Sequence, residues 1–313
     1  MLFTSLDDLA AEISLTPMQA LGIPVAIVGA VFLSVGTQFQ HRGVDAFEGG
    51  DQRGAHLGGS AVLKLLRNPA WVVGTLLLGL AVVMQLGALA LAPLIVVQPL
   101  GAVALVATAV LNARLAKIKL DHLTIRAIAL CLVGIGIFVG VAAIFAVERP
   151  ISDRQLLTVL SLLVVGLAGV GVAWWFYRKR ANAIFYIVTA GVLYGFVVTL
   201  SKIVINRIIS GQFEWLTIVC GIGVVIALVA GSYAVQLAHA SGPPDLVIAG
   251  LTVVDPLVAV LIGVTVLGEA AATPPWAIIV FAAAGAIAVT GVLQLARHHP
   301  QIRPLAEAPE ETP

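Results

Sequence analysis

Apolar segments of about 20 residues recur along the whole chain, and they constrain the fold more than any other feature. A helix needs about 20 consecutive apolar residues to cross a hydrocarbon core of roughly 30 Å. Only 11% of the 313 residues are charged, whereas a soluble domain carries about 25% on a surface that must face water. The polar borders predict nine spans, at 18–39, 70–91, 93–113, 123–146, 155–177, 183–208, 216–238, 245–268 and 275–296. The sequence therefore predicts an all-α integral membrane protein that contacts the lipid bilayer.

Lys and Arg are distributed unevenly between the two sides of this arrangement, and short cytoplasmic loops hold the excess. One side has only Arg149, Arg154 and Arg207. The other side, which includes the C-terminus, has twelve: Arg42, Arg53, Lys64, Arg67, Arg114, Lys117, Lys119, Arg178, Lys179, Arg180, Arg297 and Arg303. The imbalance predicts an N-terminus outside and a C-terminus in the cytoplasm, in the plasma (inner) membrane.

A sequence pattern occurs twice, which indicates an internal repeat. Residues 85–93 run from Gln-Leu to Pro, and residues 236–244 repeat that interval of eight residues. Each copy is followed by a polar residue, Pro and Leu, at 98–100 and at 255–257. Because the copies are five spans apart, an odd number, the two halves are expected to cross the membrane in opposite senses.

The predicted domain organisation follows from this repeat. Residues 1–17 form an extracellular N-terminal segment, 18–297 a transmembrane domain and 298–313 a disordered cytoplasmic tail. Within the transmembrane domain we expect repeat one at 18–146, a connector helix at 155–177 and repeat two at 183–296.

Three segments resemble a known family. Residues 92–111 and the Thr-Leu-Ser-Lys stretch at 199–202 resemble the NIPA family of magnesium transporters. Residues 256–269, which end in Leu-Gly-Glu, are similar to the end of the second repeat in the wider drug/metabolite transporter superfamily, the EamA-like proteins. The resemblance implies inverted halves around a central substrate path, with Mg²⁺ as the transported ion. The chain differs from many relatives where 93–113 ends, because Asn112-Ala113-Arg114 stands there in place of an acidic residue.

Asp255 is the most informative polar residue, because a carboxylate at a helix centre in lipid costs about 2.5 to 3.5 kcal/mol and usually faces a water-filled path. It directly precedes Pro256, which frees the carbonyl of Thr252 from its helical hydrogen bond. Freed carbonyls line cavities in transporters and coordinate cations. Asp255 and Thr252 are therefore candidate substrate-binding residues, with Asp255 a candidate ligand of a metal ion. The alternative is a structural carboxylate that holds two helices together.

Lys202 is the second candidate, near the outer end of span 183–208. Three interpretations remain open at this point: it pairs with Asp255, it binds an anionic group of the substrate, or its long side chain reaches the outer interface. A pair with Asp255 would offer a switch that substrate releases.

Four glutamines complete the predicted binding residues: Gln98, the repeat mate of Asp255, with Gln85, Gln236 and Gln38 at helix ends. An amide can contact a polar ligand or hold helices together. Glu269, by contrast, ends its span on the outer side, and we expect its carboxylate to face water.

The remaining features narrow the function. No phosphate-binding loop and no HExxH motif occurs, so the chain is not expected to be an enzyme or to hold a cofactor other than transported Mg²⁺. Cys131 and Cys220 lie inside apolar runs and indicate no disulfide or metal site. Nothing in the sequence indicates nucleic acid binding. The GxxxG pair Gly191 and Gly195 fits internal packing or a homodimer contact.

We therefore predict a secondary transporter that works by alternating access, with magnesium or another divalent cation as substrate. A transporter of a small organic metabolite or drug is the second interpretation, and a non-transporting membrane scaffold or lipid-handling protein is the third.

Overall fold

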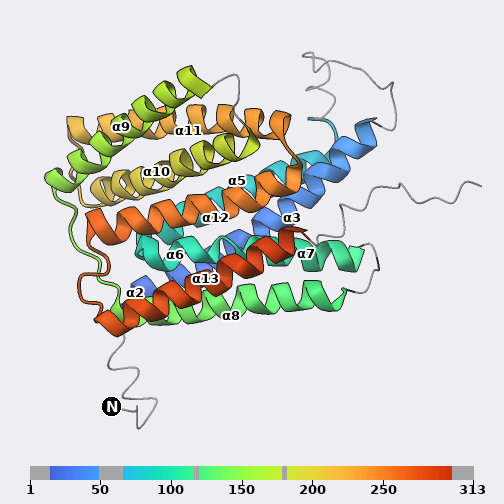
Figure 1. Ribbon diagram of the computed structural model, residues 1–313, viewed down its shortest axis with the longest axis horizontal. Coiled ribbons are helices and arrows are strands. Elements are labelled where there is room, and N and C mark those ends of the chain that lie inside the picture. The colour runs from blue at the N-terminus through green and yellow to red at the C-terminus, as the bar shows by residue number, and fades with distance from the viewer. Residues whose placement is uncertain (1–14, 49–65, 116, 118–119, 178–181, 298–313) are drawn as a thin grey trace, which may run out of the picture.

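Figure 1 shows a computed structural model that describes residues 15–48, 66–115, 117, 120–177 and 182–297. The regular structure of these residues is helical throughout. The elements are α2 (Pro17–Ala20), α3 (Gly22–Glu48), α5 (Pro69–Leu91), α6 (Leu94–Leu100), α7 (Val103–Leu115), α8 (His122–Phe145), α9 (Asp153–Tyr177), α10 (Ala183–Ile209), α11 (Trp215–Ser241), α12 (Pro244–Ile262), η1 (Gly263–Leu267) and α13 (Pro275–Arg297).

Nine segments in the described part of the chain are long and apolar enough to cross a membrane, which confirms the predicted fold class. Their bounds differ from the prediction in three places. The first helix continues to Glu48 rather than ending at residue 39, the third span is divided into α6 and α7, and the eighth ends in the π-helical turn η1. The predicted segments 1–17 and 298–313 lie almost entirely outside the described residues.

The break between α6 and α7 has a local cause. Pro99 has no backbone N–H to donate within the helix. The amides of Gly101 and Ala102 instead donate to the carbonyls of Gln98 and Pro99, each over 3.2 Å and only three residues back. The tighter turn divides the span at its centre.

Glycines at a seven-residue spacing allow α3 to approach α5 closely. A Cβ on Gly22 would lie 2.6 Å from Cβ of Ala92, and one on Gly43 would lie 2.7 Å from Cβ of Trp71. Gly29 and Gly36 occupy the same face between them and would meet α5 at 3.0 and 3.1 Å. Small residues at this spacing bring helix backbones into van der Waals contact, which is a principal source of packing energy in lipid.

The helix pairing agrees with the predicted repeat. In the first half α3 packs on α5 and on α7, and in the second half α10 packs on α11 and on α12. The last helices of the two halves, α8 and α13, pack on each other. α3 begins at the left of Figure 1 and α10 at the right, so the corresponding helices run in opposite senses.

The GxxxG pair is used inside the chain. A Cβ on Gly191 would lie 2.6 Å from Val254, and one on Gly195 would lie 2.7 Å from Val258. Because the residue numbers of the two partners increase together, from 191 and 254 to 195 and 258, α10 and α12 run parallel at this contact.

Candidate functional site

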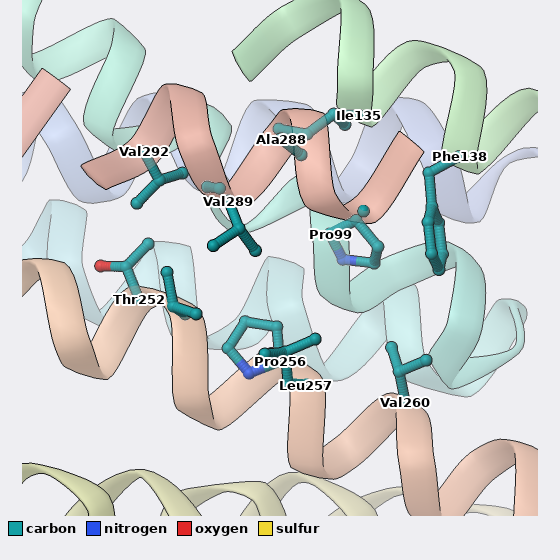
Figure 2. A pocket seen from close by; sticks show the side chains of 13 residues that line it. Pro99, Ile135, Phe138, Thr252, Pro256, Leu257, Val260, Ala288, Val289 and Val292 are labelled. Carbon is teal, nitrogen blue, oxygen red and sulfur yellow. The ribbon is translucent and has the colours of Figure 1, made fainter. Parts of the chain in front are cut away.

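A cavity of about 90 Å³ lies between the two halves at the middle of the bundle. Pro99 of α6 and Pro256 of α12, the prolines of the two repeats, line it from opposite sides (Figure 2). α8 and α13 close it through residues that include Ile135, Phe138 and Val289. Of the predicted binding residues, Thr252 alone contributes to this wall, and its hydroxyl donates to the carbonyl of Ile248 over 2.8 Å. The repeat therefore brings its two prolines to a shared central space.

Each proline is preceded by a polar side chain with an unsatisfied atom. Oδ1 of Asp255 and Nε2 of Gln98 are buried, and neither has a hydrogen-bond partner among the described residues. Buried polar atoms are nearly always paired, so such exceptions call for an explanation. Neither side chain lines the cavity, whose wall has the following prolines instead. A carboxylate oxygen and an amide without partners in the described part of the chain are nonetheless groups that could contact a hydrated cation or another polar solute.

Lys202 does not pair with Asp255, and that interpretation was wrong. Its side chain is 2% exposed, and its Nζ lies 2.8 Å from Oε1 of Glu148 and 3.6 Å from Oε1 of Glu269. The geometry of α10 explains why. Asp255 lies beside Gly191, and Lys202 is eleven residues farther along the helix, which at 1.5 Å per residue is about 16 Å.

Glu269 does not face water, so this expectation was also wrong. It is 3% exposed, and its Oε1 and Oε2 accept the backbone N–H groups of Leu94 and Ile95, each over 2.8 Å. Burial raises the pKa of Glu269, and the ammonium of Lys202 and these two amides oppose that rise. The ionised form of this carboxyl therefore depends on Lys202.

Two glycines turn Glu269 into the bundle. Gly268 follows η1 with φ of 72°, a left-handed conformation that favours glycine. Gly263 leaves room for the carboxylate, because a Cβ there would lie 2.9 Å from Oε2 of Glu269. A residue that looks like a solvated helix end in the sequence thus reaches the interior.

None of the four predicted glutamines is part of the cavity wall. Gln38 donates from Nε2 to Oδ1 of Asn112, joining α3 to α7. Gln85 is half-buried on α5, and Gln236 is exposed on α11. A substrate-binding role for these three residues stays a prediction.

Sequence reasoning missed Glu148, Glu269 and Asn112. A signal for two of them was present, because Asn112 follows Pro99 by thirteen residues and Glu269 follows Pro256 by thirteen. Asn112 and Glu269 are thus repeat mates. Glu148 gave no signal, since it lies in the segment between α8 and α9 and only the fold brings it to Lys202.

The part of the chain that the structure describes contains no group of three or more His, Cys, Asp or Glu side chains that could hold a metal ion. A divalent cation at the centre would have to be bound by fewer carboxylates, which is the usual arrangement for Mg²⁺ with its retained waters.

Comparison with known proteins places this geometry in a family. The pattern described as "Magnesium transporter NIPA" matches residues 18–267. The chain belongs to the NIPA magnesium transporter family. The family assignment agrees with the resemblance seen in residues 92–111 and 199–202. This NIPA-family chain is a membrane transporter, built from the nine apolar helices described above.

An uncharacterized protein of Corynebacterium glutamicum is 26% identical to this NIPA-family chain over 282 residues, which is 88% of this chain and 95% of the relative. The similarity therefore extends over most of both chains. No solved structure matches the chain.

Proposed function

We propose that this chain transports Mg²⁺ across the plasma (inner) membrane by alternating access between its two halves. The observation that carries the proposal is the buried Oδ1 of Asp255, which has no hydrogen-bond partner among the described residues, in a member of a magnesium transporter family. Asp255 does not line the cavity itself but directly precedes Pro256, which does. Alternating access in transporters with inverted repeats rocks one half against the other around a site near the midplane.

Asp255 is the residue that we expect to contact the ion. Mg²⁺ keeps several of its waters and is commonly held by one or two carboxylates. One carboxylate, with Gln98 as a hydrogen-bonding partner for retained water, fits an ion that passes through while largely hydrated. Thr252, one helical turn before Pro256, adds a polar group to the wall that the ion passes.

The orientation follows from the charge imbalance between the two sides. We infer that the end of the bundle with Glu148, Lys202 and Glu269 faces outward. The opposite end, with Arg42, Arg114 and the C-terminus of α13, faces the cytoplasm, in agreement with the rule that cytoplasmic loops hold the excess of Lys and Arg.

The wall of the cavity supports a second candidate function. Apart from Thr252 the residues that line it are apolar, including Phe138 and Val289. Predominantly apolar pockets with few polar groups are typical of sites for small organic molecules. Transport of a small organic solute is therefore the alternative to Mg²⁺.

The test is Mg²⁺ uptake into proteoliposomes that contain the purified chain and an internal magnesium dye. We expect uptake above that of protein-free liposomes, unaffected by Asp121→Asn. Asp121 caps α8 by accepting the amide of Thr124, and asparagine caps equally well. Uptake equal to that of protein-free liposomes, from protein that is folded and inserted, would reject Mg²⁺ and favour the organic solute.

A further inference from the structure

The ion pair of Lys202 and Glu269 lies at the break between α5 and α6. α5 ends at Leu91 and α6 begins at Leu94. Nζ of Lys202 donates to the carbonyl of Ala92 over 2.7 Å, and the carboxylate of Glu269 accepts the amides of Leu94 and Ile95. Both residues belong to the second half, whereas the turn between the successive spans α5 and α6 belongs to the first.

Each charge meets the helix end of opposite polarity. A helix carries about half a positive charge at its N-terminus and half a negative charge at its C-terminus. The ammonium lies at the C-terminal end of α5, and the carboxylate lies at the N-terminal end of α6. Exchanging the two charges would place each of them against a helix end of the same sign.

Further contacts tie the same end of the two halves. Val147 donates its amide to the carbonyl of Glu269 over 2.8 Å, and Glu148 accepts from Nε2 of Gln19 over 3.0 Å while pairing with Lys202. Gln155 of the connector α9 donates to the carbonyls of Val266 and Leu267 in η1. The first half, the connector and the second half therefore meet around one buried ion pair.

We propose that Lys202 and Glu269 form the outer gate of the transporter, a lock that holds the outer end closed because its charges match the dipoles of the two helix ends, of α5 and of α6, that meet at this turn. The structure is then the outer-closed state. Opening toward the outside requires the carboxylate to leave α6 and the ammonium to leave Ala92. The inference rests on the proposed transport cycle, and it makes both side chains positioning residues that need not contact the ion.

The test measures access to the cavity from outside and needs no magnesium. In a background with Cys131→Ala and Cys220→Ala, Val260→Cys places a thiol on the cavity wall on the outer side of Pro256. Its reaction with a membrane-impermeant thiol reagent is compared with that of Ser210→Cys, an exposed position at the same end of the bundle.

We expect slow labelling of the cysteine at 260, and labelling about tenfold faster after Lys202→Met or Glu269→Gln, as the population shifts toward the open state. The double exchange, Lys202→Glu with Glu269→Lys, should label as fast as either single variant. Single variants that label no faster than the background would overturn the gate. A double exchange that restores slow labelling would overturn the dipole lock, because a simple ion pair survives exchange.

A second arm does not depend on those variants folding. A Cβ on Gly263 would lie 3.3 Å from Cβ of Leu94, near the separation of about 3.8 Å typical of a disulfide. We expect oxidation of the pair Leu94→Cys and Gly263→Cys to stop transport until a reductant is added. Transport that continues through the cross-linked protein would overturn the gate. If Mg²⁺ uptake fails while the labelling behaves as expected, magnesium is rejected as the substrate and the gate is retained.

Discussion

Two equivalent positions of the repeat carry different side chains, the neutral amide of Asn112 and the carboxyl group of Glu269. At one end of the bundle Gln38 donates to Asn112, a neutral contact between α3 and α7 of the same half. At the other end Lys202 pairs with Glu269, which follows its proline by the same thirteen residues as Asn112. Each contact joins two residues of one half. The charged pair differs because it also binds backbone groups of the first half, at Ala92, Leu94 and Ile95.

The difference indicates how an inverted repeat can be biased. If both ends were chemically equal, the outer-closed and inner-closed states would have similar free energies. A buried ion pair that also satisfies three backbone groups holds one end more firmly than a single amide contact, since hydrogen bonds to charged groups are roughly twice as strong as neutral ones. The comparison therefore predicts that the outer-closed state is the resting state.

Removing the cation at the charged end should have the largest effect. Lys202→Met leaves Glu148 and Glu269 as buried carboxylates without their ammonium, which costs about 3 to 5 kcal/mol of folding free energy. Gln38→Met at the neutral end removes one amide hydrogen bond and should cost about 1 kcal/mol. Thermal unfolding in detergent, followed by tryptophan fluorescence, measures both. Equal losses at the two ends would contradict the comparison.

Placing a charge at the neutral end should reduce the folding free energy by an intermediate amount. Asn112→Asp has the same shape but buries a carboxylate whose hydrogen-bond partner among the described residues is the amide of Gln38, at a cost of about 2 kcal/mol. Gln38→Lys added to it should recover part of the loss.

The matched control for this change is Asn182→Asp. Asn182 caps α10, and aspartate serves equally well as a cap. If Asn112→Asp is as stable as the control in the same unfolding measurement, the position of Asn112 tolerates a charge. The difference between the charged and the neutral end would then have no physical basis.

Removing a salt bridge outside the lock should reduce the folding free energy least. Nη1 of Arg207 lies 2.7 Å from Oδ1 of Asp153, whose side chain is 59% exposed. Asp153→Asn should cost no more than about 0.5 to 1 kcal/mol, because exposed pairs contribute little and Arg207 keeps Glu214 and Thr217 as partners. A loss as large as that of Lys202→Met would remove the distinction between the lock and other outer ion pairs.

The spans and their repeat could be predicted because they depend on local signals. Length, apolar composition and the borders set by proline and charge identify the nine apolar spans of the described residues. The outer cluster could not be predicted in the same way. Glu269 looks like a solvated helix end until Gly268 and Gly263 direct it inward, and the partners of Lys202 come from three other segments of the chain. Of the three interpretations of Lys202, pairing with Asp255 was wrong, because α10 and α12 run parallel and Asp255 lies level with Gly191.

The central claim is that the transported ion passes Asp255. Its most direct test is Mg²⁺ uptake into dye-loaded proteoliposomes by Asp255→Asn, a change that keeps the shape of the side chain and removes its charge. We expect uptake to fall to that of protein-free liposomes while the variant remains folded and Asp121→Asn transports normally. Uptake by Asp255→Asn equal to that of the unmodified chain would contradict it.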